Sequence, residues 1–163
     1  MVTWIVYAGA AVACLAIGLV AAGQAGALGG RRPADLGVHD GRLKPPPSTP
    51  NSVSSQAALY EGDGARYARI EPLHFDGDAG TAFERLKQVV SSAPGARVID
   101  SRPDYLYAEF TTPLLHFVDD VEFYLPPGAA RIELRSASRL GQSDLGTNRK
   151  RIERIRADFA AAH

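Results

Sequence analysis

The sequence predicts an α+β domain: an antiparallel sheet of about five strands with two helices on one face, in the order β-α-β-β-β-β-α. Two observations predict this class. Four runs of β-forming residues follow one another between residues 96 and 138, and consecutive strands joined by short turns pair antiparallel. Segments with apolar residues at helical spacing flank these runs on both sides. An apolar helix and an extended Pro-rich arm are expected to precede the domain.

The length of 163 residues allows one domain with appendages. We assign residues 1–30 to a transmembrane anchor, 31–66 to a Pro/Ser-rich linker or docked arm, and 67–163 to the α+β domain. The formal net charge is zero, so no overall field favours nucleic acid, and we expect no nucleic-acid partner. The single cysteine, Cys14, lies in the apolar segment and excludes an intrachain disulfide.

Residues 1–30 carry no charged side chain, and the stretch from Trp4 to Leu28 is long enough to cross a bilayer as a helix. Trp4 and Tyr7 stand where an interfacial aromatic belt is expected. Two alternatives are a cleaved signal peptide, although the basic n-region is missing, and a lipoprotein signal at Cys14, although the apolar run continues past it. The sequence favours a membrane anchor.

Basic residues follow this segment, and apart from the amino terminus none precedes it. By the positive-inside rule we expect a single-pass protein of the bacterial inner membrane with its domain in the cytoplasm. A periplasmic domain is the alternative. The basic residues are Arg31, Arg32, Arg42 and Lys44.

The linker contains three consecutive prolines, Pro45–Pro47, which favour a polyproline II spacer. It also contains more apolar side chains than a spacer needs, so part of it is expected to dock on the domain. These residues are Leu36, Val38, Leu43 and Val53. Asn51 suits a capping role or, alternatively, a ligand contact.

Alternating or β-rich runs predict the strands of the domain, with turns at Pro103-Asp104 and at 126–129. The expected strands are 67–75, 96–102, 105–112, 117–125 and 130–138. Helical spacing predicts helices over 77–95 and about 145–162, the first capped by Asp78 or Thr81. The second carries an apolar stripe of Ile152, Ile155, Phe159 and Ala162.

Three stretches resemble a family of bacterial proteins known as domain of unknown function 1499: "TPNSVSSQA" (49–57), "FVDDVEFYL" (117–125) and "RSASRLGQSDLGTNRKRIERIR" (135–156). The resemblance covers about residue 36 to the C-terminus. It implies a fold class and often a membrane or lipoprotein anchor, but no activity. Many relatives carry a Cys at the position of Ser52, so thiol chemistry does not transfer to this chain.

The third stretch crosses from a strand to a helix, and a helix N-terminus beside arginines is a natural anion site. We expect a binding or scaffolding module whose partner is an anionic small molecule, a lipid headgroup or a protein. Asp144 is placed to cap the helix, and Asn148 lies on its inward stripe. The candidate ligand-binding residues are Arg135, Ser138, Arg139, Asp144, Asn148, Arg149 and Asn51.

The alternation of the strands places Asp120 and Glu122 on the polar sheet face with Arg135. One interpretation is a face of cross-strand ion pairs, such as Arg131 or Arg135 with Glu122. The alternative is a hydrolase-like enzyme that uses these carboxylates together with Arg135. Asp119 must point to the opposite face from Asp120. No metal ligands or cofactors are expected, because the histidines show no ligand spacing: His39, His74, His116 and His163.

Overall fold

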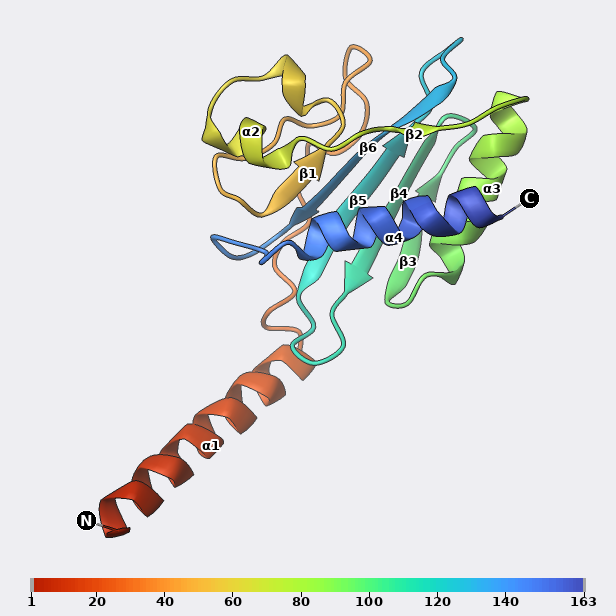
Figure 1. Ribbon diagram of the computed structural model, residues 1–163. Helices are drawn as coiled ribbons and strands as arrows, with labels where there is room; N and C mark the ends of the chain where they lie inside the picture. Colours follow the sequence, from red (N-terminus) through yellow and green to blue (C-terminus); the bar gives the residue numbers. More distant parts are fainter. Residues whose placement is uncertain (1, 163) are drawn as a thin grey trace.

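The computed structural model describes residues 2–162. Met1 and His163 lie outside the described residues, and so does the expectation that His163 is not a metal ligand. Figure 1 shows one sheet with helices against it, and an N-terminal helix that stands away from the domain. The elements are α1 (Val2–Gln24), β1 (Ser52–Ser54), η1 (Ala57–Leu59), α2 (Asp63–Ala68), β2 (Leu73–His74), α3 (Ala79–Ser92), β3 (Ala96–Ser101), β4 (Tyr105–Thr111), β5 (Val118–Tyr124), β6 (Arg131–Ser138) and α4 (Thr147–Ala161).

The sheet is antiparallel and six-stranded, in the order β1-β6-β5-β4-β3, with β2 also paired to β6. The predicted α+β class with an antiparallel sheet is therefore confirmed, whereas the expected strand count of about five is corrected to six. The additional strand is β1, in which Val53 opposes Ser136 of β6. Because three residues show little alternation, β1 carried too weak a pattern to be recognised.

The expected strand over 67–75 is wrong for most of its length. The chain is helical up to Ala68, whose side chain is buried together with Ala65, and pairing with β6 begins at Leu73. Pro72 lies between the two elements and has no N–H to donate to a ladder. The short strand β2 therefore starts after the proline.

Helices α3 and α4 pack on one face of the sheet and form the main core with it (Figure 1). The predicted cap of α3 is confirmed, since Asp78 accepts a hydrogen bond of 2.8 Å from the backbone N–H of Thr81. The side chains that meet in this core are fully buried: Phe83 and Leu86 from α3, Ile152 and Ile155 from α4, and Leu106, Phe123 and Leu134 from the strands. Apolar burial of this kind is the main stabilising contribution to folding.

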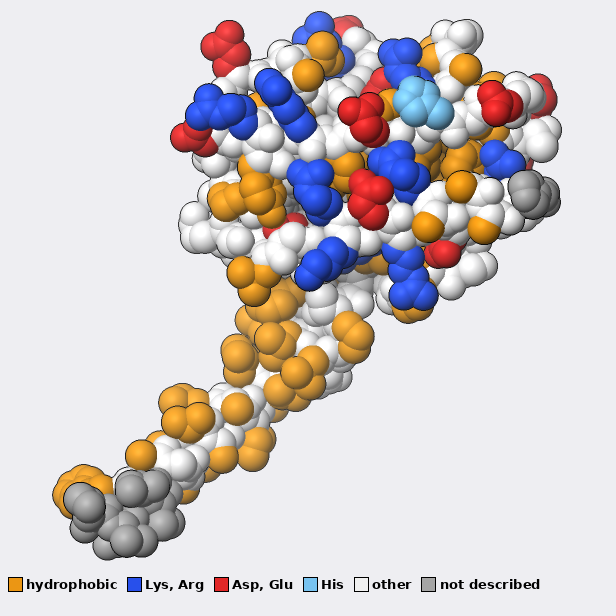
Figure 2. All heavy atoms as spheres, viewed as in Figure 1, with side chains coloured by type: hydrophobic (Ala, Val, Ile, Leu, Met, Phe, Trp, Pro, Cys, Tyr) orange, Lys and Arg blue, Asp and Glu red, His pale blue; other side chains and the backbone are white. Residues whose placement is uncertain are grey.

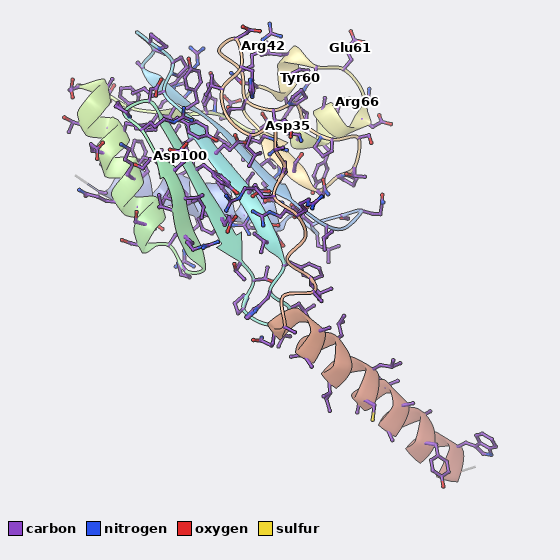
Figure 3. The ribbon with its side chains drawn as sticks, turned by 180° about the vertical axis from the view of Figure 1, so that it is seen from behind. Asp35, Arg42, Tyr60, Glu61, Arg66 and Asp100 are labelled. Carbon is purple, nitrogen blue, oxygen red and sulfur yellow. The ribbon has the colours of Figure 1, made fainter. Side chains whose placement is uncertain are left out.

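The opposite face of the sheet is crossed by the segment that follows α1, as the view from behind shows (Figure 3). Leu43 of this segment is 1% exposed and lies in a second apolar cluster with Tyr105, Tyr107 and Tyr124. The backbone N–H of Leu43 donates to the side chain of Gln56. Both faces of the sheet are thus covered.

Helix α1 ends at Gln24 and not at Leu28, which corrects the expected continuous helix over 4–28. Gly26 has a φ of 84°, a left-handed conformation that glycine adopts readily and that interrupts an α-helix. A short turn over residues 25–29 then leads into the segment that crosses the sheet.

Candidate functional site

A buried charged network lies on the sheet face beneath residues 31–44. Arg139 donates to both carboxylate oxygens of Asp120, at 2.6–3.1 Å, and to Glu109 at 2.6 Å. The phenol of Tyr107 donates to Asp120 at 2.6 Å. Strand register explains this grouping, because Glu109 of β4 is directly opposite Asp120 of β5.

Glu109 is surrounded by three arginines, since Arg32 and Arg97 also donate to its carboxylate. Burial raises the pKa of Glu109, but the hydrogen bonds from Arg139, Arg97 and Arg32 lower it more, and the net pKa is about 2. Glu109 is therefore ionised over the physiological range. Its charge is compensated by the arginines on either side.

Glu122 and Arg135 form a second pair on the same face. Of the two partners expected for Glu122, Arg131 and Arg135, the structure shows Arg135. The two residues are directly opposite on β5 and β6, and their charged groups lie 3.4 Å apart. Glu122 also accepts from the hydroxyl of Tyr105 at 2.8 Å and from the backbone N–H of Gly37 at 2.7 Å. Both charged side chains are at most 4% exposed, so this acidic face is closed to solvent.

A separate polar network lies on the helix-covered face, centred on the fully buried Asn148 of α4. Its amide NH₂ donates to the carbonyl of Asn51, to Ser138 and to the carboxylate of Asp144, at 2.9–3.1 Å. Its carbonyl oxygen accepts from Ser136 at 2.5 Å. A buried amide needs such partners, and Asn148 uses them to join the chain near β1, the strand β6 and the helix α4.

Asp144 stabilises the first turn of α4. Its carboxylate accepts from the backbone N–H groups of Asn148 and Gly146, at 2.9 and 3.0 Å, and from the hydroxyl of Tyr67. The capping role expected for Asp144 is confirmed by these bonds. Burial raises the pKa of Asp144, but the N–H groups of Asn148 and Gly146 lower it more, so its pKa lies below the usual range.

The structure divides the residues that the sequence analysis grouped as one anion site. Asn51, Ser138, Asp144 and Asn148 come together on the helix-covered face, and the Asp144 carboxylate already occupies the N-terminus of α4. Arg139 lies with Arg135 on the opposite face because side chains alternate along β6.

Neither Arg135 nor Arg139 is open to solvent, because residues 31–44 cover this sheet face and both guanidinium groups are buried. Arg149 is used elsewhere: its guanidinium donates to the backbone carbonyl of Tyr67 at 2.7 Å. Asp119 and Asp120 point to opposite faces as predicted, since Asp119 pairs with Arg151 of α4 and Asp120 with Arg139.

Sequence reasoning missed Glu109 and Arg151, which complete the two networks. Glu109 was detectable in principle, because it follows Tyr105 and Tyr107 at the two-residue period of one strand face. Arg151 bonds Asn148 and Ser136 as well as Asp119. Its role depends on the crossing of α4 over β5 and β6, and this crossing leaves no pattern in the sequence.

A hollow of about 310 Å³ lies between α4 and the turn that follows α3. Phe110 and Ile155 contribute apolar walls, together with Ala93 and Pro94 of the turn. Arg151 lies over the Phe110 ring, 4.9 Å from its centroid, in a cation–π contact. The floor of the hollow is therefore apolar.

The rim of this hollow is cationic. Lys150 is exposed, and Arg154 lies 3.9 Å from the carboxylate of Asp158, with both side chains more than half exposed. Exposed ion pairs contribute about 0–1 kcal/mol, so the Asp158 contact is weak enough for an anion to displace it. Figure 2 shows Lys and Arg side chains along the lower edge of the domain, on the side from which α1 leaves.

Together these features define a class: an α+β domain with charged networks buried on both sheet faces and an apolar helix at its N-terminus. A model of the family described as "Protein of unknown function (DUF1499)" matches residues 42–159. The chain belongs to this family, as the resemblance of its motifs predicts. No curated protein and no solved structure matches the chain.

Proposed function

We propose that the protein is a membrane-anchored binding module that holds the anionic headgroup of an amphiphile in the hollow beside α4. The observation that carries the proposal is the combination of an apolar floor with a cationic rim in one hollow of about 310 Å³. Volumes of about 300–1,000 Å³ with a few polar groups are usual for small-molecule sites. A phosphate or carboxylate headgroup suits Lys150 and Arg154, and a short apolar portion suits Phe110 and Ile155.

Anchoring is supported by α1. It is a helix long and apolar enough to cross a membrane, and 6% of its apolar window, Tyr7–Gln24, is buried in the protein. A core helix of a soluble protein is mostly buried, so burial does not explain this composition. A bilayer would cover the exposed leucines and isoleucine that α1 presents: Leu15, Ile17 and Leu19.

Anchoring is tested by expressing the full chain, extracting the membranes with alkaline carbonate and weighing the protein intact. We expect the chain to stay in the membrane pellet with the mass of the uncleaved sequence. A shortened mass starting near residue 28 would instead identify a cleaved signal peptide, and a lipid adduct on Cys14 would identify a lipoprotein. Either result would contradict the transmembrane anchor.

The headgroup site is tested by titrating the full chain in zwitterionic nanodiscs with short-chain phosphatidylglycerol and following the binding heat. We expect saturable binding that Lys150→Glu with Arg154→Glu abolishes. Arg66→Glu with Arg102→Glu, which reverses two exposed cations elsewhere, is the matched control and should bind normally. Inorganic phosphate and short-chain phosphatidylcholine separate the contributions of anion and apolar chain. Equal binding by both double variants would overturn the proposal.

The hydrolase-like alternative relies on Asp120 and Glu122. Both carboxylates lie beneath residues 31–44 and are paired with Arg139 and Arg135. General acid–base chemistry requires a group within reach of a substrate. The observed pairing supports a structural role for these two residues.

A further inference from the structure

Exposed leucines gather in two loops at the base of the domain. The 112–117 loop joins β4 to β5 and carries Leu114, which is 63% exposed. The 139–146 loop joins β6 to α4 and carries Leu140 and Leu145, which are 42% and 87% exposed. Figure 1 shows the 112–117 loop beside the end of α1, and the 139–146 loop at the side of the domain where β6 leads into α4.

The 112–117 loop is fastened to the end of α1, and the 139–146 loop contacts the segment that follows the helix. The side-chain amide of Gln24 donates to the backbone carbonyl of Leu114 at 3.0 Å. Gly23 packs so closely on the 112–117 loop that a Cβ atom there would collide with the carbonyl of Leu115, and Gly30 packs against Arg139 and Leu140 in the other loop. The position of the 112–117 loop relative to α1 is therefore determined by direct contact, and that of the 139–146 loop by its contact with Gly30.

Each loop also contains a residue other than glycine in the left-handed region. Leu145 has a φ of 52° and His116 a φ of 51°. A branched residue in this conformation is strained, and an apolar side chain gains nothing from water. Leu145 combines the strained backbone with the most exposed large apolar side chain described outside α1. Such a combination indicates that the side chain has an apolar partner.

We propose that Leu114, Leu140 and Leu145 insert into the interfacial layer of the same bilayer that α1 crosses, so that the domain is seated on the membrane. The inference rests on the proposed anchoring. If α1 leaves the bilayer near Gln24, the bond between Gln24 and Leu114 places that leucine at the membrane surface. Leucines at this depth bury apolar area against acyl chains, as interfacial anchors do.

The test places a single tryptophan at each position in the full chain, with Trp4 replaced by phenylalanine. Leu114→Trp and Leu145→Trp are compared with Leu59→Trp, a matched control because Leu59 is 54% exposed and belongs to η1, at the far end of the domain (Figure 1). Each variant is reconstituted into phosphatidylcholine vesicles whose acyl chains carry bromine near the headgroup. Tryptophan emission and its quenching by bromine report the depth of each position.

We expect blue-shifted, quenched emission from Leu114→Trp and Leu145→Trp, and solvent-like, unquenched emission from Leu59→Trp. Unquenched emission at both loop positions would overturn the proposed insertion of the loops into the bilayer. The native chain separates this failure from a failure of anchoring, because its single tryptophan, Trp4, lies in α1. If Trp4 is quenched and the loop tryptophans are not, the insertion of the loops is overturned and the anchoring by α1 stands. If neither Trp4 nor the loop tryptophans are quenched, both the insertion and the anchoring are overturned.

Discussion

Asn148 is the residue at which three separate parts of the chain are joined. Its side chain bonds the carbonyl of Asn51, the hydroxyls of Ser136 and Ser138, and the carboxylate of Asp144. Asn148 itself is fully buried, so its amide group cannot bond to bulk water in place of these partners. The amide therefore contributes to stability mainly by satisfying polar groups that would otherwise be buried without partners.

Replacing Asn148 with alanine should destabilise the domain by about 1–3 kcal/mol, because each orphaned buried partner retains its desolvation cost. Urea unfolding of the full chain in detergent, followed by circular dichroism, measures the change. Thr147→Ala is the control, since Thr147 is exposed one position earlier on the same helix. Equal losses in the two variants would show that the network contributes nothing beyond helix formation.

Glu109 gives the protein a specific dependence on acid. Its folded pKa of about 2 lies below the ordinary value of 4.5, so the carboxylate stabilises the fold above pH 4.5 and this contribution is lost as the pH falls toward 2. Glu109→Gln should therefore be less stable at pH 7, and its difference from the native chain should shrink between pH 4.5 and 2.

The control for this prediction is Glu84→Gln. Glu84 pairs with Lys87 on α3 but its side chain is 64% exposed, so its removal should change stability by about 0–1 kcal/mol. Unfolding free energies measured at several pH values distinguish the two variants. A pH-independent loss in Glu109→Gln would mean that packing, rather than charge, accounts for the role of Glu109.

At the scale of elements, the segment that follows α1 acts as part of the domain. Leu43 packs against three tyrosines of the sheet, Gly37 donates to Glu122, and Arg32 pairs with Glu109. Leu43→Ala should therefore cost about 2–5 kcal/mol, as for other buried leucines, whereas Leu59→Ala at an exposed site should change stability by less than about 0.5 kcal/mol. Thermal unfolding of the two variants makes the comparison.

The elements that sequence predicted well are those with a strong local period. The strands from Ala96 to Ser138 agree with expectation to within a residue or two at each end, because turns at Pro103-Asp104 and 126–129 separate runs rich in β-forming residues. Alternation placed Arg135 and Glu122 on the same sheet face, and the register of β5 and β6 in the structure makes them directly opposite. Local patterns thus identified the strands and the face of these charges, but not the register or the burial of the pair.

What the sequence could not show depends on contacts between distant segments. Strand β1 has three residues, and it is identified by its pairing with β6 more than 80 positions away. The burial of Arg139 depends on residues 31–44 lying across the sheet, a choice between spacer and docked arm that composition left open. The anion site that was predicted mainly from residues 135–149 is therefore divided in the structure between the two faces of the sheet.

At the scale of the whole molecule, the contacts of Gln24 and Gly30 with the basal loops leave little freedom between α1 and the domain. These contacts hold the domain in one position relative to α1. The hollow with its cationic rim lies between α4 and the turn that follows α3, on the helix-covered side of the domain.

The side of the membrane on which the domain lies is predicted by the charges that flank α1. Arg31, Arg32, Arg42 and Lys44 follow the helix, and no Lys or Arg precedes it, so the positive-inside rule predicts a cytoplasmic domain. The C-terminus, after α4, lies at the surface of the domain, where a reporter protein can be fused (Figure 1).

Alkaline phosphatase fused there should be inactive and green fluorescent protein should fluoresce, since the first folds only in the periplasm and the second in the cytoplasm. Lysines added before α1 should reverse both signals if the basic residues set the orientation. An active phosphatase fusion of the unaltered chain would place the domain in the periplasm, and the headgroup would then come from the outer leaflet of the inner membrane.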